Sequence, residues 1–181
     1  TFGSNADLSS ELTGAYMLGF QGESLSSDSV LSMVKHFPGG GPQEFGLDPH
    51  LPSGKRQIYP GDNFDYHLKP FREAINNGLR VIMPYYGIPV GQTDEDVAMG
   101  FNKMILTDLL RDELGFTGVV CADWGIVSSR TWGVEHLTIK QRYKKSLDAG
   151  MDQYGGESDT QSVVELVEEG QISEARINLS V

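Results

Sequence analysis

Short apolar runs alternate with longer segments of helical periodicity along this chain, and no other feature constrains the fold as strongly. The apolar or β-branched runs cover residues 29–36, 79–84, 118–123 and, more weakly, 150–154. Segments of helical period lie between and around them, including 8–20 and 160–169. Such alternation is typical of a parallel α/β architecture, because parallel strands need crossover connections that helices usually provide.

Several residues mark where the helices begin and end. The helix between the second and third strands is the clearest, and its apolar face comprises Phe101, Met104, Ile105 and Leu109. Gly115 is expected to stop that helix, and Gly150 to stop a later one. Pro70 suits the first turn of a helix. Thr138 and Gln141 have the spacing of a capping box.

The strand count leaves two architectures open. Four strands with their helices fill the 181 residues, which is about half of what an eight-stranded barrel needs. The chain is then either a small complete doubly wound sheet or the second half of a (β/α) barrel whose first half is missing. The stretch 39–68 is rich in Gly, Pro and Asp and is long for a loop, and loops that follow a strand end are commonly functional.

Charge and composition exclude some classes of partner. The formal net charge is -11, which argues against nucleic acid or an anionic membrane, because both require clustered Lys and Arg. A neutral substrate fits this balance better. Cys121 is the single cysteine, so an internal disulfide and a cysteine-based zinc site are excluded. No apolar run is long enough to span a bilayer and no signal-peptide layout is seen, and the compartment stays open.

Polar and aromatic residues follow the apolar runs at the places where an α/β enzyme carries its site. These residues are Lys35 and His36, then Met83 and Tyr86, then Asp123 and Trp124. Carboxylate, cation, imidazole and aromatic rings on one rim suit a sugar, whose hydroxyls take charged hydrogen bonds and whose apolar faces stack on rings. Asp123 is placed to act on an anomeric carbon. From position alone it could equally cap the next helix, and Lys35 with His36 could be a surface pair.

Three segments together resemble glycoside hydrolase family 3. They are Lys-His-Phe-Pro-Gly-Gly-Gly at 35–41, Ile-Met-Pro-Tyr-Tyr at 82–86 and Gly-Phe-Thr-Gly-Val-Val-Cys-Ala-Asp-Trp at 115–124, and the likeness covers nearly the whole chain. The resemblance implies that Asp123 is the nucleophile of a retaining mechanism. It further implies that Lys35 and His36 hold sugar hydroxyls, that Met83 and Tyr86 line the same subsite, and that Trp124 forms part of the pocket wall.

The resemblance also implies a domain organisation. Residues 1–181 correspond to the later part of an N-terminal catalytic barrel domain, and the family's sugar-binding Asp and Arg lie upstream of residue 1. In family β-glucosidases the acid/base Glu comes from a following domain. We therefore assign that role to none of Glu44, Glu135 and Glu157, which are expected to be solvated loop charges.

A second branch of the family provides an alternative. Its β-N-acetylglucosaminidases use a loop Asp-Ser-His motif as acid/base, and Asp48-Pro49-His50 is similar to it. The match is imperfect, because Pro49 replaces the Ser, the loop is two residues longer, and Gly40 stands where a His is usual. A loop role for Asp48 and His50 is the simpler interpretation.

The sequence therefore predicts a retaining glycoside hydrolase that releases terminal β-linked glucosyl units from β-glucosides or oligosaccharides by double displacement. The alternatives are a β-N-acetylhexosaminidase with the Asp48/His50 dyad and a non-catalytic sugar-binding segment. No metal or organic cofactor is implied, since there is no ligand-spaced His/Cys cluster and no dinucleotide fingerprint. The partner that activity would require is the rest of the same catalytic protein.

Overall fold

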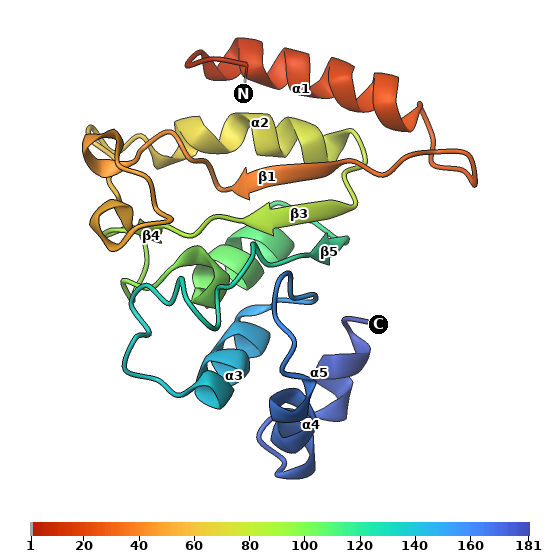
Figure 1. Cartoon of the computed structure of the whole chain (residues 1–181). Helices are drawn as coiled ribbons and strands as arrows, with labels where there is room; N and C mark the ends of the chain where they lie inside the picture. Colours follow the sequence, from red (N-terminus) through yellow and green to blue (C-terminus); the bar gives the residue numbers. More distant parts are fainter. Residues whose placement is uncertain (1) are drawn as a thin grey trace.

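Three parallel strands form the centre of the fold in the computed structural model, which describes residues 2–181. They are β1 (Met33–Phe37), β3 (Val81–Pro84) and β5 (Val119–Val120), and they lie side by side in that order (Figure 1). Cys121, directly after β5, forms a further parallel bridge with Gln153. The sequence thus predicted the four positions, but each ladder is shorter than expected, and the fourth is reduced to a single bridge.

The order of the strands chooses between the two architectures. The three strands lie in the sheet in the same order as in the chain, and the register pairs Met33 with Val81 and Val81 with Val119. A doubly wound sheet reverses its strand order at a switch point, whereas a barrel adds each strand next to the previous one. The sheet therefore has the topology of a barrel segment, and the carboxyl ends of its strands meet at one edge.

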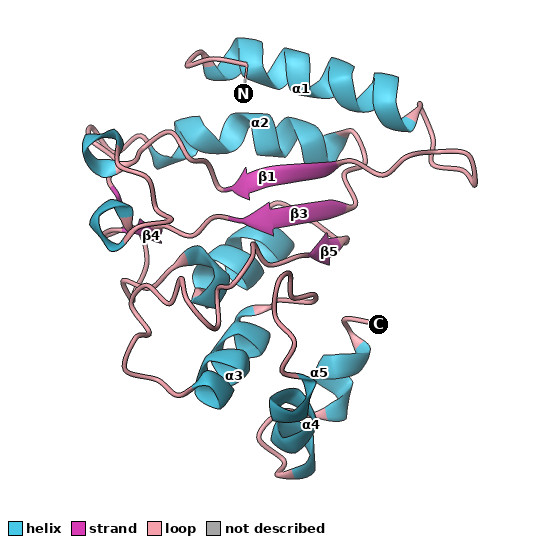
Figure 2. Cartoon of the chain, viewed as in Figure 1, coloured by secondary structure: helices cyan, strands magenta, loops and turns pink. Residues whose placement is uncertain are grey.

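Helical segments connect and flank these strands (Figure 2). The α-helices are α1 (Ala6–Gln21), α2 (Phe64–Asn76), α3 (Ile139–Ala149), α4 (Thr160–Glu168) and α5 (Glu174–Asn178). The other helical segments are the 3₁₀ turns η1 (Glu44–Gly46), η2 (Pro52–Gly54) and η3 (Met99–Phe101) and the π-helix η4 (Met104–Glu113). Phe101 therefore belongs to a separate turn before η4 and not to the same helix as Ile105.

Two expectations about the segment before β3 were wrong. Pro70 lies inside α2 and not in its first turn, because the helix already begins at Phe64 and buries Leu68. The stretch 39–68 is not a continuous loop, since it contains η1, η2 and β2 (Arg56–Gln57) and ends in α2. β2 pairs in parallel with β4 (Ile88–Pro89), which ties this stretch to the segment after β3.

The predicted helix signals at Thr138 and Gly150 are confirmed. The Thr138 hydroxyl oxygen accepts from the main-chain N–H of Gln141, and the Gln141 side-chain Oε1 accepts from the main-chain N–H of Thr138, so α3 begins with a full capping box. Gly150 ends α3 with φ 113°, a conformation that a residue with a Cβ rarely adopts. Both ends of α3 are thus set by local sequence.

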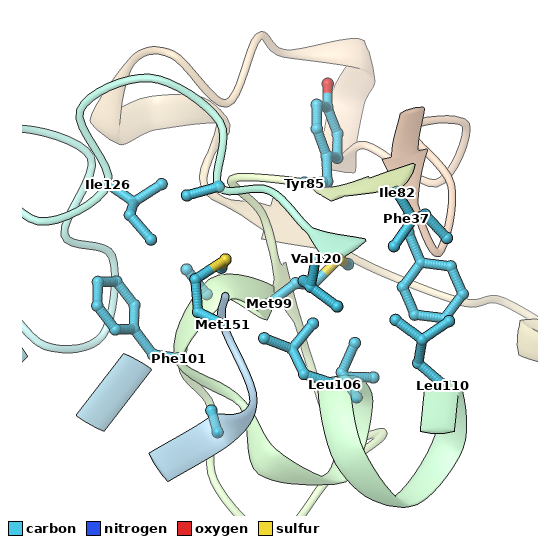
Figure 3. Packing of buried hydrophobic residues seen from close by; sticks show 14 of the residues in the cluster. Phe37, Ile82, Tyr85, Met99, Phe101, Leu106, Leu110, Val120, Ile126 and Met151 are labelled. Carbon is cyan, nitrogen blue, oxygen red and sulfur yellow. The ribbon is translucent and has the colours of Figure 1, made fainter. Parts of the chain in front are cut away.

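The core lies between the strands and the helices that cover them, and Figure 3 shows its centre. Phe37 of β1, Ile82 of β3 and Val120 of β5 are fully buried there, together with Leu106 and Leu110 of η4. Burying an apolar side chain of this size stabilises a fold by about 1.5–3 kcal/mol. This packing fixes the strands, and so fixes where the residues after them lie.

Candidate active site

Asp123 and His36 meet at the carboxyl edge of the sheet. His36 is near the end of β1 and Asp123 follows β5, and Nε2 of His36 lies 3.2 Å from Oδ2 of Asp123. The other carboxylate oxygen, Oδ1, accepts a hydrogen bond of 2.7 Å from the main-chain N–H of Trp124. Asp123 is only 8% exposed. It therefore forms a largely buried carboxylate with a hydrogen-bond donor at each oxygen.

The surroundings of Asp123 keep its carboxyl group ionised. Burial alone would raise its pKa, but hydrogen bonds from His36, the Trp124 N–H and Tyr86 together hold the pKa below its ordinary value. No Arg or Lys side chain forms an ion pair with Asp123 among residues 2–181. A carboxylate that is ionised and not neutralised by a fixed cation remains available to react with an electrophilic carbon.

Tyr86 lies beside Asp123 and joins two loops. Its hydroxyl donates a 2.6 Å hydrogen bond to the main-chain oxygen of Trp124. Burial and the neighbouring charge of Asp123 raise the pKa of Tyr86, so its phenol stays protonated. The Arg130 guanidinium lies 5.8 Å from the centre of the Tyr86 ring, within the range of a cation–π contact. Arg130 was not predicted as a site residue. The only sequence feature that could have indicated it is its place as a basic residue in the loop after Asp123-Trp124.

Asp48 and His50 form a hydrogen-bonded pair close to this group. His50 Nδ1 lies 2.7 Å from Asp48 Oδ1, and the His50 ring lies edge-on to the Tyr86 ring at 4.9 Å between centroids. Trp132 anchors Pro49, the residue between Asp48 and His50, because its indole N–H donates to the Pro49 carbonyl oxygen at 2.8 Å. Hydrogen bonds from His50 lower the pKa of Asp48. The pair expected to be a simple loop feature thus lies one side chain away from Asp123.

Lys35 and Met83 are neighbours across the sheet with different surroundings. They are paired in register between β1 and β3. Met83 is buried at 3% exposure, whereas Lys35 is exposed and has no hydrogen-bond or ion-pair partner among residues 2–181. Lys35 lines a cavity of about 810 Å³ together with His36 and Tyr85, and Asp123 is not part of that lining. The structure therefore brings Lys35 to the same rim as His36 but does not join it to Asp123.

The glycines after His36 are packed between two rings that were not predicted as site residues. A Cβ on Gly40 would lie 3.3 Å from the Tyr85 ring, and one on Gly41 would lie 3.4 Å from His67. Gln43 donates a hydrogen bond to the Tyr85 hydroxyl. The main chain after His36 can therefore lie this close to the two rings because Gly40 and Gly41 have no side chains.

The three acidic residues not assigned as acid/base are all engaged. Glu44 pairs with Arg56 at 2.7 Å, and Glu135 pairs with Lys55 at 3.2 Å. Glu157 was expected to be a solvated loop charge, but this was wrong. Its Oε1 accepts hydrogen bonds from the main-chain N–H groups of residues 127 and 128 at 2.9 and 3.0 Å, because the two loops run side by side.

Residues 2–181 contain no group of three or more His, Cys, Asp or Glu side chains arranged around a common metal position. Cys121 is buried as a free thiol, and burial raises its pKa. None of the helices in the described range combines the length and apolarity needed to cross a membrane.

Comparisons with known proteins show which family the chain belongs to. The model of the glycosyl hydrolase family 3 N-terminal domain matches residues 1–181. The chain is 51% identical over 192 residues to β-glucosidase C of Emericella nidulans, in an alignment that covers 100% of this chain and 31% of that protein. This chain thus spans less than a third of that relative's length.

Two solved structures show the same fold. A β-glucosidase from Listeria innocua in complex with isofagomine matches with a TM-score of 0.81 and 26% identity, covering 98% of this chain and 24% of that one. A β-N-acetylglucosaminidase from Paenibacillus matches with a TM-score of 0.79 and 28% identity, covering 99% and 34%. These matches confirm the predicted α/β architecture with part of a parallel barrel. The chain belongs to glycoside hydrolase family 3.

Proposed function

We propose that the protein is a retaining β-glucosidase that releases terminal β-linked glucosyl units from small β-glucosides or oligosaccharides. The observation that carries this proposal is the state of Asp123. Its carboxylate is largely buried, has a lowered pKa and is oriented by His36 and by the Trp124 N–H. The similarity to β-glucosidases supports glucose as the sugar.

The reaction proceeds in two displacements. The Asp123 carboxylate attacks the anomeric carbon and displaces the aglycone oxygen, which takes a proton from an acid group. Water then attacks the glycosyl-enzyme ester and releases the sugar with retained configuration. Lys35 and His36 hold the sugar hydroxyls, Met83 and Tyr86 line the same subsite, and Trp124 forms the pocket wall. His36 and Tyr86 also keep Asp123 ionised before it attacks.

We propose that residues 1–181 are part of the N-terminal catalytic barrel domain and that the acid/base comes from another domain of the protein. Two of the acidic candidates here, Glu44 and Glu135, are held in ion pairs, and Glu157 is held by main-chain N–H groups. These three side chains are thus occupied by contacts within the chain, and none of them is assigned as the acid/base. The rest of the same protein is therefore the partner that turnover requires.

Trapping the covalent intermediate tests this proposal. The full-length protein is incubated with a 2-deoxy-2-fluoro-β-glucoside carrying a good leaving group, then digested and analysed by mass spectrometry. The fluoroglucosyl unit should be found on the peptide that contains Asp123, and Asp123→Asn should take up no label. Label on a different carboxylate would overturn the assignment of the nucleophile.

A second function is favoured by a specific contact. The Asp48–His50 pair lies against Tyr86, which places an imidazole near Asp123 as a β-N-acetylhexosaminidase of this family would require. In that mechanism His50 supplies the proton and Asp48 orients its ring. The similarity to the Paenibacillus enzyme is compatible with it.

Two measurements distinguish the two functions: the preference between two substrates and the effect of replacing His50. The β-glucosidase proposal predicts faster hydrolysis of nitrophenyl β-glucoside than of the N-acetylglucosaminide, with His50→Ala leaving the proton-transfer step intact. The hexosaminidase alternative predicts the reverse preference and a large loss in His50→Ala. Saturable glucose binding without turnover of either substrate would instead indicate a non-catalytic sugar-binding domain.

A further inference from the structure

The indole ring of Trp124 lies directly on the main chain of two glycines. A Cβ built on Gly155 would lie 2.5 Å from Cε3 of Trp124, and one built on Gly156 would lie 2.6 Å from Cδ1. The six-membered part of the ring thus covers Gly155 and the five-membered part covers Gly156. Neither distance is possible for a real carbon atom, so any side chain on Gly155 would displace the ring.

Hydrogen bonds hold the two segments in this arrangement. The main-chain N–H of Ala122 donates to the Gln153 carbonyl oxygen at 2.7 Å, and that of Gly125 donates to the Gly155 carbonyl oxygen at 3.3 Å. Further along, Oε1 of Glu157 accepts from the N–H of Val127 at 2.9 Å. The segment 153–157 therefore runs beside 122–128 and supports it on both sides of Trp124.

Glycine is required at position 155 because the Trp124 ring occupies the place of a side chain, and not because of the backbone conformation. Gly156 has φ 65°, a conformation that favours glycine for its own sake. The φ of Gly155 is not in the left-handed region, so an alanine there would be free of backbone strain. Gly155 is therefore a position where substitution tests the contact with Trp124, whose ring supplies the three atoms nearest to the added Cβ.

The other side of the indole is open. Trp124 is 56% exposed although its inner face is covered by Gly155 and Gly156, and it directly follows Asp123 in the chain. A flat, exposed apolar surface on the residue that follows the reactive carboxylate in the chain is suited to stacking against the apolar face of a sugar ring. The orientation of that surface is set by the glycines beneath it.

We propose that Gly155 is a positioning residue that sets substrate affinity by seating the indole of Trp124. This inference rests on the proposed function, since it assigns a determinant of binding to the same site. A side chain at position 155 would displace the indole from the two glycines, so its exposed face would no longer lie where the sugar ring stacks.

The effect falls on binding because Trp124 contacts the reacting groups through its main chain. Its N–H donates to Asp123 Oδ1, and its carbonyl oxygen accepts from the Tyr86 hydroxyl. Moving or removing the side chain leaves both hydrogen bonds in place. A loss of uniform binding raises KM and leaves kcat nearly unchanged.

The test is a double-mutant cycle in the full-length protein with nitrophenyl β-glucoside as substrate. Gly155→Ala should raise KM about tenfold with kcat within about twofold, which corresponds to about 1.4 kcal/mol of lost binding. Trp124→Ala should raise KM similarly, and adding Gly155→Ala to it should have no further effect, because no ring remains to be displaced. Gly19→Ala is the matched control, since a Cβ at Gly19 in α1 meets no atom within 4 Å.

A second measurement does not depend on activity. In protein labelled with 5-fluorotryptophan, the ¹⁹F resonance of Trp124 is the one missing from Trp124→Phe, and it should shift in Gly155→Ala but not in Gly19→Ala. If no variant or wild type hydrolyses the substrate while this resonance shifts, the proposed function fails but the seating of Trp124 stands.

Two results would overturn the proposal. One is an equal rise of KM from Gly155→Ala in the wild type and in Trp124→Ala, which would show that Gly155 acts independently of the indole. The other is an unchanged Trp124 resonance in Gly155→Ala. If Gly155→Ala fails to fold, the double variant with Trp124→Ala decides: folding of the double variant supports the clash, and its failure to fold contradicts it.

Discussion

The imidazole Nε2 of His36 lies 3.2 Å from the carboxylate Oδ2 of Asp123, although the two residues come from β1 and from the segment after β5. β3 lies between those strands, so the contact spans the width of the three-stranded sheet. It joins the Lys-His motif to the Asp-Trp motif. The His36 hydrogen bond is also one of the interactions that lower the pKa of Asp123.

Removing this hydrogen bond should change the pH dependence of activity. Asp123 must be ionised to attack, so kcat/KM falls as pH decreases through the pKa of its carboxyl group. Because His36 helps to lower that pKa, His36→Ala should raise it and move the acid limb of the kcat/KM profile to higher pH. His36→Gln, which keeps a donor, should move the limb less. An acid limb unchanged in His36→Ala would contradict the role of this contact.

The lowered pKa of Asp123 also makes the free energy of unfolding depend on pH. A carboxyl group whose pKa is lowered by folding contributes stability above its unfolded pKa, and that contribution is lost as pH falls through the folded value. In His36→Ala the folded pKa lies closer to the unfolded one. The free energy of unfolding of His36→Ala should therefore fall less than that of wild type between neutral and acidic pH. Urea unfolding at several pH values measures this difference.

Asp123→Asn should reduce kcat by about three orders of magnitude or more, because the covalent step is removed. The amide keeps an oxygen that can accept from the Trp124 N–H but loses the ionised carboxylate that His36 contacts, so only a modest fall in melting temperature is expected at neutral pH. Asp94→Asn is the matched control, since Asp94 lies exposed in another loop. Comparable losses of kcat in both variants would show that Asp123 has no special role.

Trp132→Phe should destabilise the protein by about 1–3 kcal/mol. The buried indole N–H would be lost, and the Pro49 carbonyl oxygen would lose its donor. The free energy of unfolding from urea titration measures this effect. Trp124→Phe is the control, because the Trp124 side chain is exposed and donates no hydrogen bond among the described residues. Equal unfolding free energies for wild type and Trp132→Phe would refute the anchoring of the Asp48–His50 segment.

Gly118→Ala should destabilise the sheet by about 1–3 kcal/mol through overpacking. A Cβ at Gly118 would lie 2.2 Å from the carbonyl oxygen of Arg80 and 2.7 Å from the Phe116 ring, so β3 and β5 would have to separate. Gly19→Ala, in open space on α1, should be neutral or slightly stabilising. Thermal unfolding of the two variants, compared with wild type, distinguishes a local steric effect from a general effect of replacing glycine.

The sequence by itself determined the locally encoded parts of this protein. The capping box of Thr138 and Gln141 and the terminal Gly150 define α3 with chemistry that lies within the helix and its flanks. The positions of the strands followed from their apolar runs, although the ladders are shorter. Ser32, for example, donates its N–H to the Gln21 side chain and not to a neighbouring strand. The motifs around His36 and Asp123 indicated the family, because their order and spacing are local properties of the chain.

Only the tertiary structure decided which distant residues meet. The barrel-like strand order, the position of His50 against Tyr86, and the support of Trp124 by Gly155 depend on contacts between segments far apart in the chain. Glu157 looked like a solvated charge because its partners are main-chain N–H groups of a distant loop, which leave no trace in residue types. The sequence thus determined the chemical groups of the site, and packing of the core determined their arrangement, since it fixes the edge at which they converge.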